Sequence, residues 1–125
     1  MPATVKEMLD AANAVVPKIT MEEATALAAA GKAVIVDVRD SAELAEAGKV
    51  QGAVHIPRGS LEFRADAGTS YHDPRLDPAK TVILYCAAGS RAPLAGKASK
   101  DMGYADVRNL GGFKAWVDAG GAVER

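Results

Sequence analysis

One cysteine, Cys86, directly follows the β-branched and aromatic segment 81–85 and opens a run of small, uncharged residues that ends at Arg91. Segment 81–85 predicts a strand that ends at the thiol, and a helix is expected to start right after the run. A tight loop between them could turn its backbone N–H groups inward as an anion cradle. Because these groups, the helix start and Arg91 all favour negative charge, the sequence predicts a reactive thiolate at Cys86.

Burial as a small hydrophobic residue is the alternative for Cys86, because free cysteine is among the residue types most often buried. Its neighbours favour a chemical role, since a strand precedes it and four small residues, an arginine and a helix start follow it. The sequence contains no second cysteine, so neither an internal disulfide nor a resolving thiol is available. We therefore expect an intermolecular acceptor for any group that the thiol takes up.

Helices and strands are predicted to alternate along the chain, and this alternation must position the Cys86 loop. Expected helices cover 5–16, 20–30, 40–47, 92–102 and 113–117, and expected strands cover 33–38, 54–56, 81–85 and 106–110. A Thr or Asp followed three residues later by Glu, at Thr20 and Asp40, predicts capping boxes at two helix starts. Segment 58–78 is rich in Gly and Pro and is predicted to be the longest irregular stretch. The alternation indicates one open α/β sheet, with ligands beyond the carboxyl ends of its strands.

The composition of the 125-residue chain is typical of a globular protein, with 49% hydrophobic residues, 25% charged residues and a formal net charge of −1. That balance provides no global field for nucleic acid or an anionic membrane, so neither is an expected partner. Every apolar run is shorter than the ~18 residues that a membrane-spanning helix needs. The N-terminus also lacks the pattern of a signal peptide. We expect a soluble cytoplasmic protein that binds anions only locally.

Four segments together resemble a known family. Cys86–Ala92 resembles the active-site loop of rhodanese-type sulfurtransferases. Asp37-Val38-Arg39, the segment 52–57 (GAVHIP) and the segment 109–116 (NLGGFKAW) resemble further recurring blocks of that family, in the same order. The resemblance extends over about residues 19–123 and is specific because four blocks share both order and spacing.

The resemblance implies a fold and a division of the chain. We expect a single rhodanese-like α/β domain at 18–125, with a central, mostly parallel β-sheet flanked by helices on both faces. An extra amphipathic helix is expected at 1–17, outside the resemblance. Its apolar face must be covered, either by docking on the domain or by a second copy in a homodimer.

In this family the cysteine takes sulfane sulfur from a donor such as thiosulfate, becomes a persulfide and passes the sulfur to a nucleophilic acceptor. The resemblance therefore implies that Cys86 is the nucleophile, with a small anionic sulfur donor and with cyanide, a thiol or a protein as acceptor. The residues expected to bind the donor and the persulfide are Ala87, Ala88, Gly89, Ser90 and Arg91. Their backbone N–H groups would hold the developing charge, and Arg91 would pair with the donor's anionic oxygens. No cofactor and no metal is expected.

Three charged residues outside the loop are candidates for supporting roles. Asp37 and Arg39 lie on the same side of the strand that they end, and we expect them to serve mainly as a structural ion pair. Arg58 departs from the family pattern, which usually has glycine after the His-Ile-Pro block. It is either a solvated cation or a second cation at the rim of the pocket. His55 is expected to be a hydrogen-bonded histidine, and the two histidines do not show metal-ligand spacing.

Two other functions remain open. Cysteine phosphatases resemble this loop but commonly place five residues between Cys and Arg, whereas four separate Cys86 from Arg91. The shorter loop indicates a smaller pocket, which favours a cysteine-bound sulfur over phosphate, although a phosphatase or arsenate-handling enzyme stays an alternative. The second alternative is a non-catalytic sulfur carrier or sensor that delivers sulfur to one protein partner.

Overall fold

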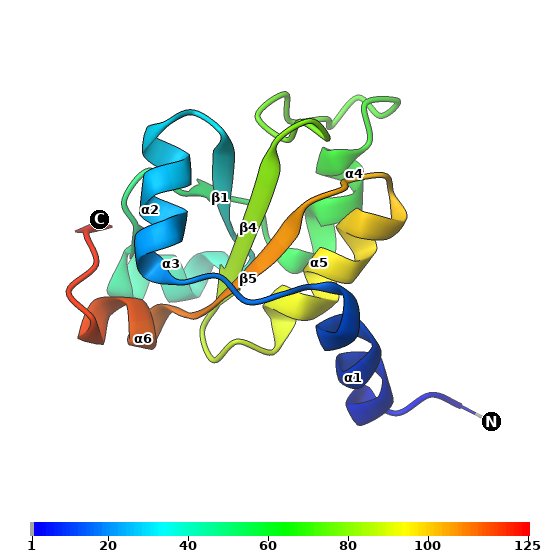
Figure 1. Ribbon diagram of the computed structural model, residues 1–125, viewed down its shortest axis with the longest axis horizontal. Coiled ribbons are helices and arrows are strands. Elements are labelled where there is room, and N and C mark those ends of the chain that lie inside the picture. Colours follow the sequence, from blue (N-terminus) through cyan, green and yellow to red (C-terminus); the bar gives the residue numbers. More distant parts are fainter. Residues whose placement is uncertain (1) are drawn as a thin grey trace.

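The computed structural model describes residues 2–125 and places four parallel strands at the centre of the molecule (Figure 1). The strands are β1 (Ala33–Asp37), β3 (Val54–His55), β4 (Thr81–Cys86) and β5 (Val107–Gly112). They lie in the order β3-β1-β4-β5, so β4 is an inner strand between β1 and β5. This arrangement confirms the predicted α/β sheet and puts Cys86 at the carboxyl end of an inner strand.

Helices cover both faces of the sheet, as predicted (Figure 1). They are α1 (Val5–Val15), α2 (Met21–Ala29), α3 (Ser41–Ala47), α4 (Leu61–Ala65), α5 (Arg91–Asp101) and α6 (Phe113–Asp118). The end of α1 packs with α4 and α5 in the core on one face, and α2 packs with α6 in the core on the other. The predicted N-terminal amphipathic helix is α1.

The side chains of β4 alternate between these two cores. Val82, Leu84 and Cys86 belong to the core beneath α4 and α5. Ile83 and Tyr85 belong to the core beneath α2 and α6. Because successive side chains of a strand point to opposite faces, Cys86 faces α5 while its neighbour Tyr85 faces away from it.

The predicted capping box at the start of α2 is present. Thr20 Oγ1 accepts a hydrogen bond from the backbone N–H of Glu23 at 3.1 Å, and the Glu23 carboxylate accepts one from the Thr20 N–H at 3.3 Å. Thr4 and Glu7 form the same box at the start of α1. Each box satisfies N–H groups that the helix leaves unpaired and stabilises its helix by about 1 kcal/mol.

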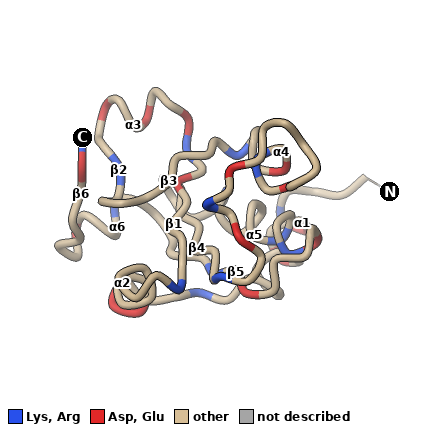
Figure 2. Tube along the Cα trace, turned by 90° about the horizontal axis from the view of Figure 1, so that it is seen from above, with Lys and Arg blue, Asp and Glu red and all other residues tan. Residues whose placement is uncertain are grey.

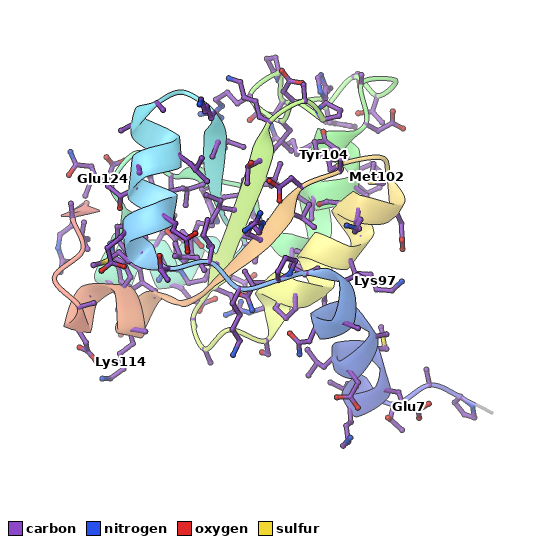
Figure 3. All side chains as sticks on the ribbon, in the orientation of Figure 1. Glu7, Lys97, Met102, Tyr104, Lys114 and Glu124 are labelled. Carbon is purple, nitrogen blue, oxygen red and sulfur yellow. The ribbon has the colours of Figure 1, made fainter. Side chains whose placement is uncertain are left out.

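The prediction that segment 58–78 is irregular is wrong for its first part, which contains helix α4. A 3₁₀ turn, η1 (Arg58–Ser60), leads into α4, where Leu61 and Ala65 are buried. Tyr104 lies beside this helix (Figure 3), and its hydroxyl donates a hydrogen bond to the Ala65 carbonyl at 2.8 Å. Burial and this bond stabilise a helix whose own sequence signal covers only one turn.

A second small sheet was also not predicted. β2 (Lys49–Val50) pairs antiparallel with β6 (Val123–Glu124). The indole N–H of Trp116 donates to the Ala122 carbonyl at 2.9 Å and ties this end of the chain to α6. This two-stranded sheet of β2 and β6 thereby closes the core beneath α2 and α6.

Helix α1 docks on α5 and leaves part of its surface uncovered. Ala12 and Val16 are buried, and both methyl groups of Val16 lie close to Gly96 of α5. Val5 and Met8, by contrast, are 67% and 49% exposed. The structure therefore shows intramolecular docking of α1 through its C-terminal half.

Charged residues of both signs are mixed along the chain, in agreement with the formal net charge of −1 (Figure 2). Within residues 2–125, no helix has the length and apolar character needed to cross a membrane.

Candidate active site

The Cys86 loop joins the end of β4 to the start of α5, at the lower end of the sheet in Figure 1. Cys86 is the last residue of β4, and Arg91 is the first residue of α5. The four residues between them form bends, and Ala87, Ala88 and Ser90 are exposed. The predicted order of strand, short loop and helix is therefore confirmed.

The sulfur of Cys86 lies beneath this loop. The residue is 0% exposed and packs in the core beside Ala92. The backbone N–H of Gly89 donates a hydrogen bond to Cys86 Sγ, with 3.0 Å between nitrogen and sulfur. Gly89 reaches this position with φ +95°, a conformation that favours glycine. The burial is the one expected of a structural cysteine, whereas the amide directed at the sulfur is a feature of the predicted cradle.

Other amides of the loop are available to a ligand. Within residues 2–125, the backbone N–H groups of Ala87, Ala88 and Ser90 donate no hydrogen bond to a protein acceptor. Since these residues are exposed, their N–H groups can bond to water or to an anion. The loop therefore offers one amide to the sulfur and further amides to whatever approaches it.

Arg91 makes a two-pronged ion pair with Glu43 of α3. The Arg91 Nη1 atom donates to Glu43 Oε1 at 2.9 Å, and Nη2 donates to Oε2 at 3.0 Å. The side-chain hydrogen bonds from Arg91 lower the pKa of Glu43 from 4.5 to about 2. The same bonds, and then the charge of Glu43, raise the pKa of Arg91.

Glu43 was not predicted to be part of this site. The sequence pattern indicated only a capping role for Glu43 at the helix start, and the Asp40 N–H does donate to Glu43 Oε1 at 3.0 Å. The capping pattern accounted for the glutamate, so nothing in the local sequence indicated that its carboxylate also reaches Arg91 across the site.

Asp37 and Arg39 pair with each other in the protein interior. Arg39 Nε and Nη2 donate to the Asp37 carboxylate at 3.0 and 2.7 Å. Asp37 Oδ2 also accepts a hydrogen bond from the Tyr85 hydroxyl at 2.5 Å, and that hydroxyl accepts one from the Val50 N–H at 3.0 Å. Burial, followed by the bond to Asp37, raises the pKa of Tyr85. The Asp37 carboxylate therefore accepts hydrogen bonds from both Arg39 and Tyr85.

Arg39 links this buried pair to the Cys86 loop. Its guanidinium lies over the ring of Phe113 with 4.2 Å between the guanidinium carbon and the ring centroid, and it donates to the Gly48 carbonyl at 2.7 Å. Arg39, Phe113 and Ala87 line a cleft of about 290 Å³, together with Lys114 and Val117. The cleft thus places Arg39 near Ala87, the residue that follows Cys86.

A bulge in β5 brings two glycines against the loop. Leu84 pairs with Asn109, but the next pair is Tyr85 with Gly111, so the register shifts by one residue. The Asn109 side-chain carbonyl accepts the Gly111 N–H at 2.8 Å and holds this bulge. Gly112 then lies against Ala87 of the loop. Gly111 lies against Gly89 of the same loop, so both glycines border the site.

Arg58 and His55 form their side-chain hydrogen bonds with residues outside the Cys86 loop. Arg58 donates to Glu62 at 2.8 Å and lines a groove with Met8 of α1 and Leu94 of α5. Among the described residues, it makes no hydrogen bond to the Cys86 loop. His55 Nε2 donates to the Arg39 carbonyl at 2.7 Å, which agrees with the expected hydrogen-bonded histidine.

Comparison with known proteins identifies sequence relatives. The family model described as the rhodanese-like domain matches residues 20–119. The human thiosulfate:glutathione sulfurtransferase is 31% identical over 110 residues, which covers 82% of this chain and 94% of the relative. A protein of the same name from Saccharomyces cerevisiae is 32% identical over 98 residues, covering 70% of this chain and 67% of the relative.

Solved structures of other proteins have a similar overall fold. A human single-domain sulfurtransferase is 29% identical with a TM-score of 0.68, over 82% of this chain and 96% of the other. A protein of unknown function from Rhodopseudomonas palustris, described as a possible tyrosine phosphatase, is 42% identical with a TM-score of 0.87. That match covers 99% of both chains and so includes the region of α1.

Proposed function

The chain belongs to the rhodanese-like domain family, with sulfurtransferases among its relatives, and we propose that it transfers sulfane sulfur through a persulfide on Cys86. The observation that carries this proposal is the hydrogen bond from Gly89 N–H to Cys86 Sγ inside the β4–α5 loop. It directs a fixed donor at the sulfur atom of the chain's only cysteine, beside further amides that have no acceptor among residues 2–125.

In the first half of the reaction, the Cys86 thiolate attacks the outer sulfur of thiosulfate. The sulfur–sulfur bond of the donor breaks, and sulfite leaves with the bonding electron pair. No general acid is required, because sulfite is a stable anion. The loop amides of Ala87, Ala88 and Ser90 would stabilise the charge on the transferred sulfur, since preorganised N–H groups need not reorient during the reaction.

In the second half, an acceptor nucleophile attacks the outer sulfur of the Cys86 persulfide. The new bond forms to the acceptor, and the electron pair of the broken sulfur–sulfur bond returns to Cys86 as thiolate. Cyanide would leave as thiocyanate and a thiol would leave as a hydropersulfide. The names of the human and yeast relatives favour glutathione as the acceptor thiol.

A steady-state assay tests this function. Folded protein is incubated with thiosulfate and either glutathione or cyanide, and sulfite or thiocyanate is measured. Turnover that the Cys86→Ser variant lacks supports the enzyme. Persulfide formation without turnover of either acceptor supports a sulfur carrier instead.

A phosphatase is the second candidate, favoured by the description of the Rhodopseudomonas palustris protein. The loop argues against it, because four residues separate Cys86 from Arg91 and Arg91 is already paired with Glu43. Hydrolysis of an aryl phosphate, with no sulfite release from thiosulfate, would replace the sulfurtransferase proposal with this one.

A further inference from the structure

Arg91 is the cation of the Cys86 loop, and Glu43 occupies it. Both terminal nitrogens of the guanidinium donate to the two oxygens of one carboxylate, at 2.9 and 3.0 Å. A carboxylate bound in this way uses the same edge of the guanidinium that would bind two oxygens of a sulfate, thiosulfate or phosphate ion. An oxyanion at this edge must therefore displace Glu43.

The position of Glu43 is fixed from two sides. Its Oε1 atom accepts the Asp40 N–H at 3.0 Å in addition to the bond from Arg91. The charge of Arg39 also acts favourably on the Glu43 carboxylate. The Asp40 N–H lies at the start of α3, the helix that contains Glu43. The Glu43 carboxylate can therefore bond to its own helix start and to Arg91 at the same time. Displacing it breaks a charge-assisted contact and leaves Glu43 facing the incoming anion.

We propose that Glu43 is a specificity-determining residue that keeps oxyanions off Arg91. The identity of the sulfur donor in this inference rests on the proposed sulfur transfer. The exclusion of anions from Arg91 does not depend on that proposal. It predicts that the site favours sulfane-sulfur donors without an oxyanion, such as an alkyl hydropersulfide, over thiosulfate. With such a donor, the Cys86 thiolate attacks the outer sulfur, the donor thiolate leaves with the electron pair, and the proton stays on the transferred sulfur.

Direct anion binding tests the exclusion without any sulfur transfer. Sulfate has the shape and charge of a tetrahedral dianion and no transferable sulfur, so we would titrate it calorimetrically at constant ionic strength. The test variant is Glu43→Gln, which removes the charge and keeps an oxygen for the Asp40 N–H. Glu46→Gln is the matched control, since Glu46 is an exposed glutamate of the same helix and its loss changes the net charge equally.

We expect Glu43→Gln to bind sulfate about tenfold more tightly than the parent, equivalent to about 1.4 kcal/mol. Glu46→Gln should bind sulfate as the parent does, and Glu43→Gln combined with Arg91→Ala should lose the gain. Glu43→Ala, with its fold checked by circular dichroism, provides a second route to a free Arg91. If neither Glu43 variant binds sulfate more tightly, the proposal is wrong and Glu43 serves only to position Arg91.

The corresponding prediction for activity concerns the ratio of the kcat/KM values for two donors. The ratio of kcat/KM for thiosulfate to kcat/KM for an alkyl hydropersulfide should rise in Glu43→Gln and stay unchanged in Glu46→Gln. A protein that forms no persulfide with either donor would contradict the proposed function, while its sulfate titration would still decide the role of Glu43. The two failures are therefore distinguishable.

Discussion

Gly112 lies so close to Ala87 that a Cβ atom at residue 112 would be 2.5 Å from the Ala87 carbonyl oxygen. The neighbour is backbone, so it cannot rotate away as a side chain would. The bulge at Gly111 creates this approach and brings β5 against the residue that follows Cys86. The geometry of the Cys86 loop therefore depends on the absence of a side chain on the adjacent strand.

Replacing Gly112 by alanine should displace the loop more than it unfolds the protein. We expect Gly112→Ala to lower the free energy of unfolding by about 1–3 kcal/mol, as overpacking does. The rate of persulfide formation on Cys86 should fall more steeply, because the Gly89 amide would no longer be held at the sulfur. Urea unfolding and mass spectrometry measure the two effects. Gly59→Ala is the control, since a Cβ atom there meets nothing within 4 Å; an unchanged rate in Gly112→Ala would refute this role.

The buried pair of Asp37 and Arg39 should contribute to stability in a way that depends on both partners. Arg39→Met leaves the Asp37 carboxylate without its main counter-ion, and breaking a buried pair in this way costs about 3–5 kcal/mol. Tyr85→Phe removes only the hydroxyl between Asp37 and Val50, so we expect a loss of about 1–3 kcal/mol. Chemical denaturation checks both values. Equal and small losses would show that the pair is not the support that the geometry indicates.

The Glu43–Arg91 pair should make stability depend on acidity. Because Arg91 lowers the pKa of Glu43 from 4.5 to about 2, the pair stabilises the folded state fully above pH 4.5. That contribution is lost as the pH falls toward 2 and Glu43 takes up a proton. The pair is partly exposed, so we expect Glu43→Gln to cost about 1 kcal/mol at neutral pH. Unfolding of both proteins between pH 7 and pH 2 should show this difference shrinking; a constant difference would contradict the pKa shift.

Gly96 and Val16 should be energetically coupled, because α1 packs against α5 through them. A Cβ atom at Gly96 would lie 2.9 Å from both methyl groups of Val16, and a valine side chain has little freedom to move. We expect Gly96→Ala to destabilise the protein by about 1–3 kcal/mol. Val16→Ala should relieve the clash, so the double variant should lose less stability than the sum of the two single variants. Strict additivity in thermal unfolding would argue against this contact.

Local sequence signals were sufficient to predict the Cys86 loop. A β-branched run, four small residues and a helix start at Arg91 adjoin one another in the chain, and the structure keeps that order. The same holds for the capping box at Thr20. These features depend on backbone conformation over a few residues, which residue type largely determines.

Contacts between distant segments could not be predicted in this way. The carboxylate of Glu43 reaches Arg91 from a different helix, and Gly112 reaches Ala87 through a bulge. Helix α4 was missed because its two buried residues cover a single turn, and the ribbon of β2 and β6 was missed because two-residue strands show no periodicity. In each case tertiary packing, rather than local preference, stabilises the element.

The intact mass of the protein shows whether Cys86 accepts a sulfur atom. After folded protein is incubated with thiosulfate and the excess donor is removed, we expect a gain of the mass of one sulfur atom that Cys86→Ser does not show. Addition of cyanide should return the protein to its original mass and release thiocyanate. If the mass of the folded protein stays unchanged with both thiosulfate and an alkyl hydropersulfide, Cys86 does not carry sulfur and the proposed function is wrong.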